Sequence, residues 1–498
     1  MIIFCIVVFL VAMIVVGYVA TKKVKNSNDY YLGNKEFGPF ATAFKFASTW
    51  ESGSKLVGSP GQAYASGMTA FLQGLTSPLA YFMSFRVFGP RLKAASDYYD
   101  VITVPEMLGK RYHSQTVHTV SSLALLVGLM GTLLGQFQSI GNVVGTVLEI
   151  PYVPALVGGV AIIGLYTVFG GYRASVWTDM AQGACMVGGS ILIFFFVIKE
   201  AGNWSLPSLN EQLNAIQPTM LHLTGGAEMT VLTLCTFLII PLFMGIALPQ
   251  QSVAIFSMKD RRVGNASLII CVLFSTVLIW GLYLAAMTAR TMDGFVVQSP
   301  DAVTTTLAIQ YMPEVLAGLF ITAIMAAIMS TCDGVLLVAS SILTRDIFRR
   351  IKPDVYEKHA VAYNRLATMV VCVIPLLIAI KPPAAVFWVV SFAMALTVFT
   401  FALPMLGIIA IRRATKEAAL AQIIVVVLLI PAWVVFGLDK STGISALAIG
   451  MLAAPVVFFP VMLLTKPPAS DPETDRLWEI YGEIREERRK AKLARKKG

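Results

Sequence analysis

Thirteen apolar segments, each about long enough to cross a lipid bilayer, follow one another along this chain of 498 residues. A bilayer core about 30 Å thick requires about 20 residues of helix, and only helices or closed barrels satisfy every backbone polar group inside lipid. Charged residues make up 13% of the chain, whereas a soluble domain carries about 25%. The sequence therefore predicts an all-α polytopic membrane protein with thirteen spans. The segments are 2–21, 38–58, 67–87, 116–147, 153–170, 175–198, 229–252, 264–288, 313–343, 362–380, 383–410, 418–437 and 443–464.

The positions of the Lys and Arg residues predict how the chain is oriented. If the first segment starts outside the cell, the loops on the inner side hold 32 of the 38 basic residues. Cytoplasmic loops carry this excess of positive charge. We therefore expect a multi-pass protein of the plasma membrane, with its N-terminus outside and its C-terminus in the cytoplasm. Because the basic residues lie in short loops between spans, the lipid bilayer is the expected partner and nucleic acid is not.

The second segment, 38–58, carries Lys45, Glu51 and Lys55 and is interrupted by the run Ser52-Gly53-Ser54. A charged residue at the centre of a spanning helix costs about 2.5–3.5 kcal/mol. We expect these three residues to be paired, in contact with water, or functional. An interruption at mid-membrane also frees backbone carbonyl and amide groups, which can then hold an ion or a solute.

A second interrupted segment lies five spans later, where Pro241, Gly245 and Pro249 divide an otherwise continuous apolar run. Interrupted helices at matching positions of two halves indicate an inverted-repeat transporter that binds its substrate at mid-membrane. A pair of ordinary proline kinks is the alternative interpretation.

Small and hydroxyl residues share one face of the ninth segment. Ala327, Ser330, Thr331 and Gly334 recur at helical spacing. This face either permits close helix packing or supplies neutral oxygens to a hard cation such as Na⁺. Asp333 flanks the face, and a carboxylate at that depth requires a cation, a proton or a basic partner.

Five motifs, in this order along the chain, resemble the sodium:solute symporter family, which includes sodium/proline, sodium/pantothenate, sialic acid and sugar symporters. They are SNDYYLG (27–33), GSPGQAYASG (58–67), VPEMLGKRY (104–112), LYTVFGGYRASVWTD (165–179) and AAIMSTCDGVLLVASSILTRDIF (326–348). The resemblance implies a LeuT-type fold of two five-helix inverted repeats, with one extra helix before them and two after, and cation-driven uptake by alternating access. The implied divisions are a first span with an inner loop (1–36), the first repeat (37–200), an outer loop (201–228), the second repeat (229–415), two further spans (416–465) and a basic cytoplasmic tail (466–498).

The resemblance also implies a Na⁺ site. At matching positions, its ligands are the backbone carbonyls of Ser48, Glu51 and Ala327 and the hydroxyls of Ser330 and Thr331.

Some family members have a second Na⁺ site, built from an aspartate at the position of Asp179 and from hydroxyls. Asp333 and Gly334 stand at the hydroxyl positions here, so Asp179 and Asp333 are expected to form an altered site for a second cation or a proton. A structural alternative for Asp179 is a carboxylate stabilised by the dipole of its own helix.

The implied substrate-binding residues lie at both interruptions and on the fourth segment. They are Ser52, Gly53, Gln136, Gln138, Phe243, Met244 and Gly245, with Trp388 or Phe392 as further candidates, and Lys55 is added because of its own charge.

Three charges depart from the family pattern. Glu51 and Lys55 are four residues apart, so they either form an internal ion pair or act separately. In the second case Lys55 faces a solute carboxylate and Glu51 carries a proton or binds the cation. Lys45 either extends to the inner interface or places its ammonium where Na⁺ would bind, as a substitute for a proton or cation.

We expect a secondary active transporter that couples Na⁺ entry to the uptake of a small organic solute with a carboxylate. The sequence contains no GxxxxGK[ST] phosphate loop, which argues against an ATP-driven pump, and neither enzymatic activity nor a bound cofactor is expected. Three alternatives stay open: an H⁺-coupled or Na⁺-independent transporter of the same fold, a proton-translocating subunit of a respiratory complex, and a transport-inactive membrane sensor.

Overall fold

The structure is a computed structural model that describes residues 1–21, 27–201, 205–222, 230–468 and 471–497. Parts of the predicted inner loop (1–36), outer loop (201–228) and tail (466–498) lie outside these ranges. Helices are the regular elements of the described chain, as the sequence predicts. The first nine are α1 (Ile2–Thr21), α2 (Ser27–Leu32), α3 (Pro39–Trp50), α4 (Ser59–Ser66), α5 (Thr69–Phe82), α6 (Gly89–Tyr98), α7 (Val104–Arg111), α8 (Gln115–Leu148) and α9 (Tyr152–Glu200).

The remaining helices complete the bundle and its tail. They are α10 (Leu206–Ile216), α11 (Val231–Leu242), α12 (Met244–Ala247), α13 (Pro249–Phe256), α14 (Val263–Ala289), α15 (Val303–Tyr311), α16 (Glu314–Ser341), α17 (Arg349–Ile351), α18 (Pro353–Ala379), α19 (Val386–Ile409), α20 (Lys416–Val435), α21 (Leu438–Thr442), α22 (Ala446–Leu464) and α23 (Pro472–Lys497). Short π-helical segments occur between α-helices at Ser54–Gly58, Met83–Phe88 and Ile342–Phe348. Turns of 3₁₀ helix occur at Gly33–Lys35, Pro218–Leu221 and Pro300–Ala302.

Eight helices in the described part of the chain are, by length and composition, able to cross a membrane. Three shorter apolar helices, Ile2–Val16, Tyr152–Leu165 and Val231–Leu242, accompany them. Helix α9 runs through both predicted segments 153–170 and 175–198. The exact number of thirteen spans therefore stays a prediction.

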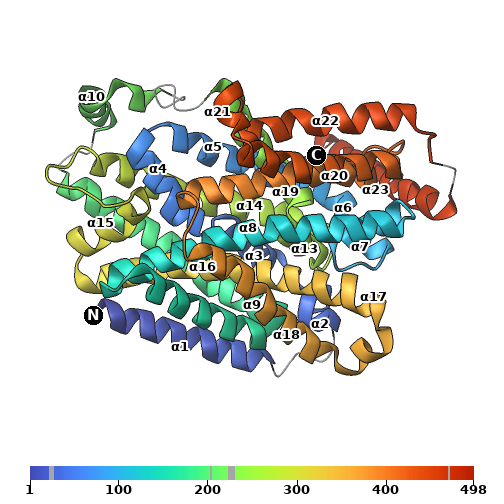
Figure 1. Ribbon diagram of the computed structural model, residues 1–498, viewed down its shortest axis with the longest axis horizontal. Helices are drawn as coiled ribbons and strands as arrows, with labels where there is room; N and C mark the ends of the chain where they lie inside the picture. Colours follow the sequence, from blue (N-terminus) through green and yellow to red (C-terminus); the bar gives the residue numbers. More distant parts are fainter. Residues whose placement is uncertain (22–26, 202–204, 223–229, 469–470, 498) are drawn as a thin grey trace.

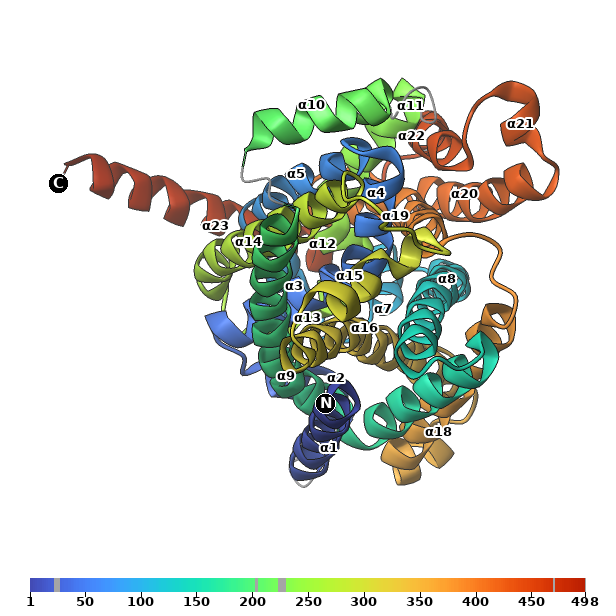
Figure 2. The same cartoon turned by 90° about the vertical axis from the view of Figure 1, so that its left-hand side faces the viewer.

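Helix α16 lies at the centre of the bundle, and α1 and α18 lie at its edge (Figures 1 and 2). Inside the protein, 83% of the most apolar stretch of α16 is buried, against 28% for α18. Small residues allow this close packing: a Cβ added at Gly189 of α9 would lie 2.9 Å from Cβ of Ala323 on α16. The hydroxyl face of α16 therefore lies where several helices meet.

The C-terminal helix α23 extends away from the bundle (Figure 2). Its first half packs against the protein through the buried side chains of Leu477, Tyr481 and Ile484. The guanidinium of Arg91, on α6, lies 5.6 Å from the centre of the Tyr481 ring. The ion pair between Arg412 and Asp475 and the hydrogen bond from Arg488 to the Arg86 carbonyl add polar contacts to this apolar face.

Candidate functional site

The interruption predicted in the second apolar segment is present. Helix α3 ends at Trp50, and Glu51 has a non-helical backbone (φ −80°, ψ 62°). The chain resumes as the π-helical segment Ser54–Gly58 and then as α4. The backbone N–H of Gly53 donates to the side-chain oxygen of Gln136, on α8, at 3.0 Å. The break is therefore fixed in place by a neighbouring long helix.

Gly53 approaches α8 and α16 so closely that a side chain would not fit. A Cβ there would lie 2.6 Å from Cγ1 of Ile328 and 2.8 Å from the Gln136 oxygen. We expect Gly53→Ala to lower the free energy of unfolding by about 1–3 kcal/mol, as overpacking does, measured by thermal unfolding in detergent. Gly158→Ala is the matched control, because no atom lies within 4 Å of its Cβ position. Equal shifts of the unfolding temperature in the two variants would contradict this prediction.

The hydroxyl face of α16 contacts the last carbonyls of α3. Ser330 Oγ donates to the Ser48 carbonyl at 3.0 Å, and Thr331 Oγ1 donates to the Thr49 carbonyl at 3.1 Å. Both hydroxyls also lie 3.1–3.2 Å from the Ala327 carbonyl. The last carbonyls of a helix lack partners within it, so the break leaves these oxygens available. Four predicted Na⁺ ligands thus come together, and Thr49 joins them.

The Glu51 side chain points away from these oxygens. Its carboxylate accepts hydrogen bonds from Tyr81 on α5 at 3.0 Å and from Ser275 on α14 at 2.5 Å. The Lys55 ammonium lies 5.6 Å from the centre of the Trp50 ring, and its charge interacts with that of Glu51. Glu51 therefore has two neutral donors besides the nearby lysine, which the sequence alone did not reveal.

Lys45 does not extend to the inner interface. Its ammonium lies 2.8 Å from Asp179 Oδ2 on α9 and 3.3 Å from Asp333 Oδ1 on α16. It donates a further hydrogen bond to Ser175 Oγ at 2.5 Å. The Lys45, Asp179 and Asp333 side chains are at most 2% exposed. Ser175 was missed, although it stands one helical turn before Asp179.

The second interruption is also present. Helix α11 ends at Leu242, α12 spans only Met244–Ala247, and Leu248 is extended (φ −85°, ψ 116°) before α13. Phe243 stacks on Phe88 with ring centres 6.0 Å apart. A Cβ at Gly245 would lie 2.4 Å from Ser84 Oγ, so Gly245 permits close contact with the π-helical segment Met83–Phe88 that follows α5.

A narrow cavity lies beside the first break. Its volume of about 20 Å³ is room for about one water molecule, so a larger solute requires the surrounding helices to move apart. Lys55 is the one charged residue among the described residues that line it. The lining residues are Trp50, Ser54, Lys55, Ser59, Phe237, Ile240, Pro241, Phe387, Val390, Ser391 and Met394.

Of the residues expected to bind substrate, Lys55 is the one found among the described residues that line this cavity. Gln138 donates to the Ala384 carbonyl at 2.9 Å, and the Ser52 hydroxyl lies 2.9 Å from that of Ser54. Trp388 packs edge-on against Phe387, with ring centres 5.1 Å apart. Trp50 and Ser59 line the cavity although the sequence did not single them out. The sequence could have indicated them only by their position on either side of the break.

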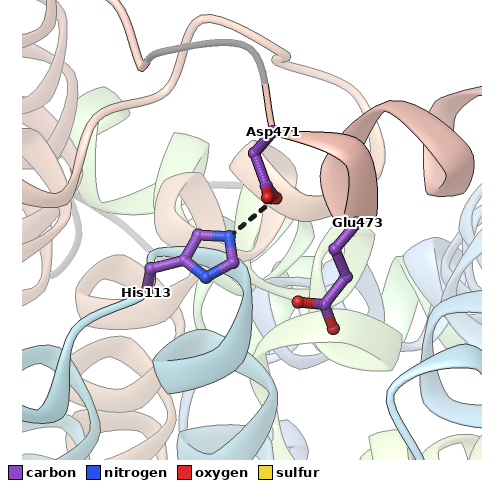
Figure 3. A group of neighbouring side chains, drawn as sticks. All are labelled: His113, Asp471 and Glu473. Atoms are coloured by element: carbon purple, nitrogen blue, oxygen red, sulfur yellow. Dashed lines mark hydrogen bonds and ion pairs between the residues drawn. The ribbon is translucent and has the colours of Figure 1, made fainter.

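Three side chains near the start of α23 form a separate polar group (Figure 3). Ligand atoms of His113, Asp471 and Glu473 lie within 4.8 Å of one another. Asp471 Oδ2 accepts the backbone N–H of Thr474 at 2.9 Å and lies 2.9 Å from His113 Nε2. The Thr474 bond holds the pKa of the Asp471 carboxyl below its usual range. Helix capping accounts for this carboxylate, and His113 and Glu473 are exposed, so we assign no metal site here.

Known proteins resemble this chain along most of its length. The model of the sodium:solute symporter family matches residues 30–465. The osmoregulated proline transporter OpuE of Bacillus subtilis (strain 168) is 30% identical over 480 residues, which cover 93% of this chain and 94% of that protein. The sodium/pantothenate symporter of Escherichia coli (strain K12) is 30% identical over 406 residues, 80% of this chain and 82% of that protein.

Two solved structures share the fold. A Na⁺-coupled sialic acid symporter in a substrate-bound outward-open state has a TM-score of 0.72 at 19% identity, covering 94% of this chain and 98% of that one. Mhp1, a nucleobase-cation-symport-1 family transporter, has a TM-score of 0.52 at 14% identity, covering 91% and 99%. These likenesses show an all-helical, multi-pass membrane fold of the LeuT type. With the family model matching most of its residues, this chain belongs to the sodium:solute symporter family.

Proposed function

We propose that this protein takes up a small organic solute bearing a carboxylate by alternating access, driven by Na⁺ that enters with it. The observation that carries this proposal is the convergence of the Ser330 and Thr331 hydroxyls on the Ser48 and Thr49 carbonyls. Together with the Ala327 carbonyl, these are neutral oxygens from two helices. A Na⁺ ion placed among them replaces the hydroxyl protons as the partner of the carbonyls.

The same helix connects the ion to the solute. Na⁺ bound at Ser48 and Thr49 joins the end of α3 to α16, and Trp50 follows directly in the chain. Trp50, Ser54 and Lys55 line the cavity. Na⁺ binding therefore favours the arrangement of the break that contacts the solute, and the solute favours Na⁺ binding to the same extent.

The lining of the cavity suggests the class of solute. A single ammonium, that of Lys55, stands among three hydroxyls and several aromatic and aliphatic side chains. An ammonium in apolar surroundings forms a strong, charge-assisted hydrogen bond with a carboxylate. Proline and pantothenate, after which two relatives are named, both carry a carboxylate.

Transport by the purified chain in proteoliposomes tests the proposal. Counterflow of radiolabelled L-proline, pantothenate and other small carboxylates identifies the solute class, and an inward Na⁺ gradient is then compared with an inward pH gradient. We expect accumulation with Na⁺ alone. Uptake that needs only the pH gradient would instead support an H⁺-coupled transporter, and no counterflow of any carboxylate would support a sensor.

We further propose that the N-terminus is outside the plasma membrane and the C-terminus is in the cytoplasm, because of the distribution of basic residues. Alkaline phosphatase fused after Ser441, between α20 and α22, should be active, since that enzyme requires the oxidising outer side. The same fusion after Gly498 should be inactive, and green fluorescent protein there should fluoresce. The opposite pattern of activities would refute this orientation.

A further inference from the structure

Lys45, Asp179, Ser175 and Asp333 form a buried cluster, which we call the ammonium site. Three oxygens surround Lys45 Nζ: Asp179 Oδ2 at 2.8 Å, Asp333 Oδ1 at 3.3 Å and Ser175 Oγ at 2.5 Å. The ammonium donates hydrogen bonds to Ser175 and Asp333 and forms an ion pair with Asp179. The oxygens belong to α9 and α16, whereas the ammonium belongs to α3. Two helices thus supply cation ligands, and a third supplies the cation.

Gly334 and Tyr172 pack closely around the Lys45 ammonium. A Cβ at Gly334 would lie 3.3 Å from Lys45 Nζ, so a larger residue would push the ammonium away. The Tyr172 ring centre lies 5.5 Å from the same nitrogen, within range of a cation–π interaction. Because the side chain fills this position, a mobile cation cannot share it.

Removal of the ammonium would leave a site that requires a cation. Asp179 is fully buried, and within the described chain its Oδ1 atom has no hydrogen-bond donor. A buried carboxylate without a counter-charge is destabilised by several kcal/mol. Oxygens of two carboxylates and one hydroxyl suit a hard cation of the size of Na⁺.

Ser48 connects the ammonium site to the proposed Na⁺ site. Its carbonyl accepts the Ser330 hydroxyl, and its own hydroxyl donates to the Phe44 carbonyl, next to Lys45 in the chain, at 2.6 Å. Lys45 stands one helical turn earlier on the same helix. Two cation positions, one tethered and one mobile, therefore lie at consecutive turns near the end of α3.

We propose that the Lys45 ammonium occupies a second cation site in place of a mobile ion, so that this protein binds a single Na⁺. This inference rests on the proposed Na⁺-coupled uptake. The cation that binds to Asp179, Ser175 and Asp333 is then the Lys45 ammonium, which is part of the chain itself. Lys45→Met removes the charge with little change of length and converts the ammonium site into a site for Na⁺.

The test is direct binding of radioactive Na⁺ to the purified full-length chain at equilibrium, which requires no solute. We expect one Na⁺ per wild-type chain, two per Lys45→Met chain, and one again when Asp179→Asn is added. Lys93→Met is the matched control: Lys93 is also buried, but it donates to Asp97 and the Phe256 carbonyl, away from the ammonium site. That control should bind the wild-type number.

The two proposals fail separately in this measurement. Ser330→Ala with Thr331→Ala should remove the wild-type ion but leave the extra ion of Lys45→Met, and a wild-type chain that binds no Na⁺ would overturn only the proposed function. Equal Na⁺ numbers in wild type and Lys45→Met would overturn the inference. If Lys45→Met does not fold, Asp179→Asn alone decides: an unchanged Na⁺ number supports the tethered cation, and the loss of one Na⁺ contradicts it.

Discussion

Replacing both Ser330 and Thr331 with alanine is expected to abolish Na⁺-driven accumulation while the protein still folds. Each hydroxyl that contacts an ion contributes about 1.5–3 kcal/mol, so the loss of both raises the half-saturating Na⁺ concentration at least about 100-fold. Folding is spared because alanine is the best helix former, so both substitutions preserve α16. Initial uptake rates in proteoliposomes over a range of Na⁺ concentrations measure the change.

Thr322→Ala is the matched control for this pair. Thr322 is a buried hydroxyl on the same helix, but it donates to the Gly318 carbonyl of its own preceding turn at 2.7 Å. Its removal should leave the Na⁺ dependence as it is in the wild type. Should the Ser330 and Thr331 double variant show the same Na⁺ dependence as Thr322→Ala, the Na⁺ site would have to be placed elsewhere.

Lys55→Met is expected to weaken solute binding about 100-fold with little loss of folded protein. A charge-assisted hydrogen bond to a carboxylate contributes about 1.5–3 kcal/mol, and Lys55 is the one charged residue that the structure describes along the cavity. Folding is retained because Glu51 keeps its hydrogen bonds from Tyr81 and Ser275. Counterflow gives the apparent affinity, and the yield of monodisperse protein reports folding.

A structural role for Lys55 gives a different result. If Lys55 mainly compensates the charge of Glu51, Lys55→Met alone reduces the yield of folded protein, and adding Glu51→Gln restores it. The double variant then binds solute as the wild type does. If Lys55 instead binds the solute, the double variant has a normal yield of folded protein and still binds the solute weakly. The yield and the apparent affinity together therefore distinguish the two roles.

Both helix breaks could be predicted from the sequence because their causes are local. The run at Gly53 and the Pro241, Gly245 and Pro249 spacing remove helix-forming residues from apolar segments. The hydroxyl face of α16 could also be predicted, because helical periodicity alone places Ser330 and Thr331 on one side of the helix. The five motifs led to the family, which the comparison confirms.

Side-chain directions beside the breaks could not be predicted. The Glu51 carboxylate turns towards Tyr81 and Ser275 because its backbone leaves the helical region after Trp50, and no sequence pattern specifies that angle. The residues that line the cavity were missed for the same reason. A helix turned by the angle of one residue directs a neighbour of Gln138 or Trp388 into the cavity in its place. The Lys45 pairs join residues 134 and 288 positions apart (45 to 179 and 45 to 333), and such contacts follow from packing alone.

Under the proposed single-Na⁺ coupling, the Lys45 ammonium stays with its helix throughout the transport cycle, and this limits the concentrating power of the protein. An elementary charge that crosses 100 mV contributes about 2.3 kcal/mol, enough for about fifty-fold accumulation. A second mobile charge would raise this limit to roughly two-thousand-fold, but a tethered one adds nothing to it. With one Na⁺ per solute, as proposed, less of the ion gradient is dissipated for each solute molecule than with two.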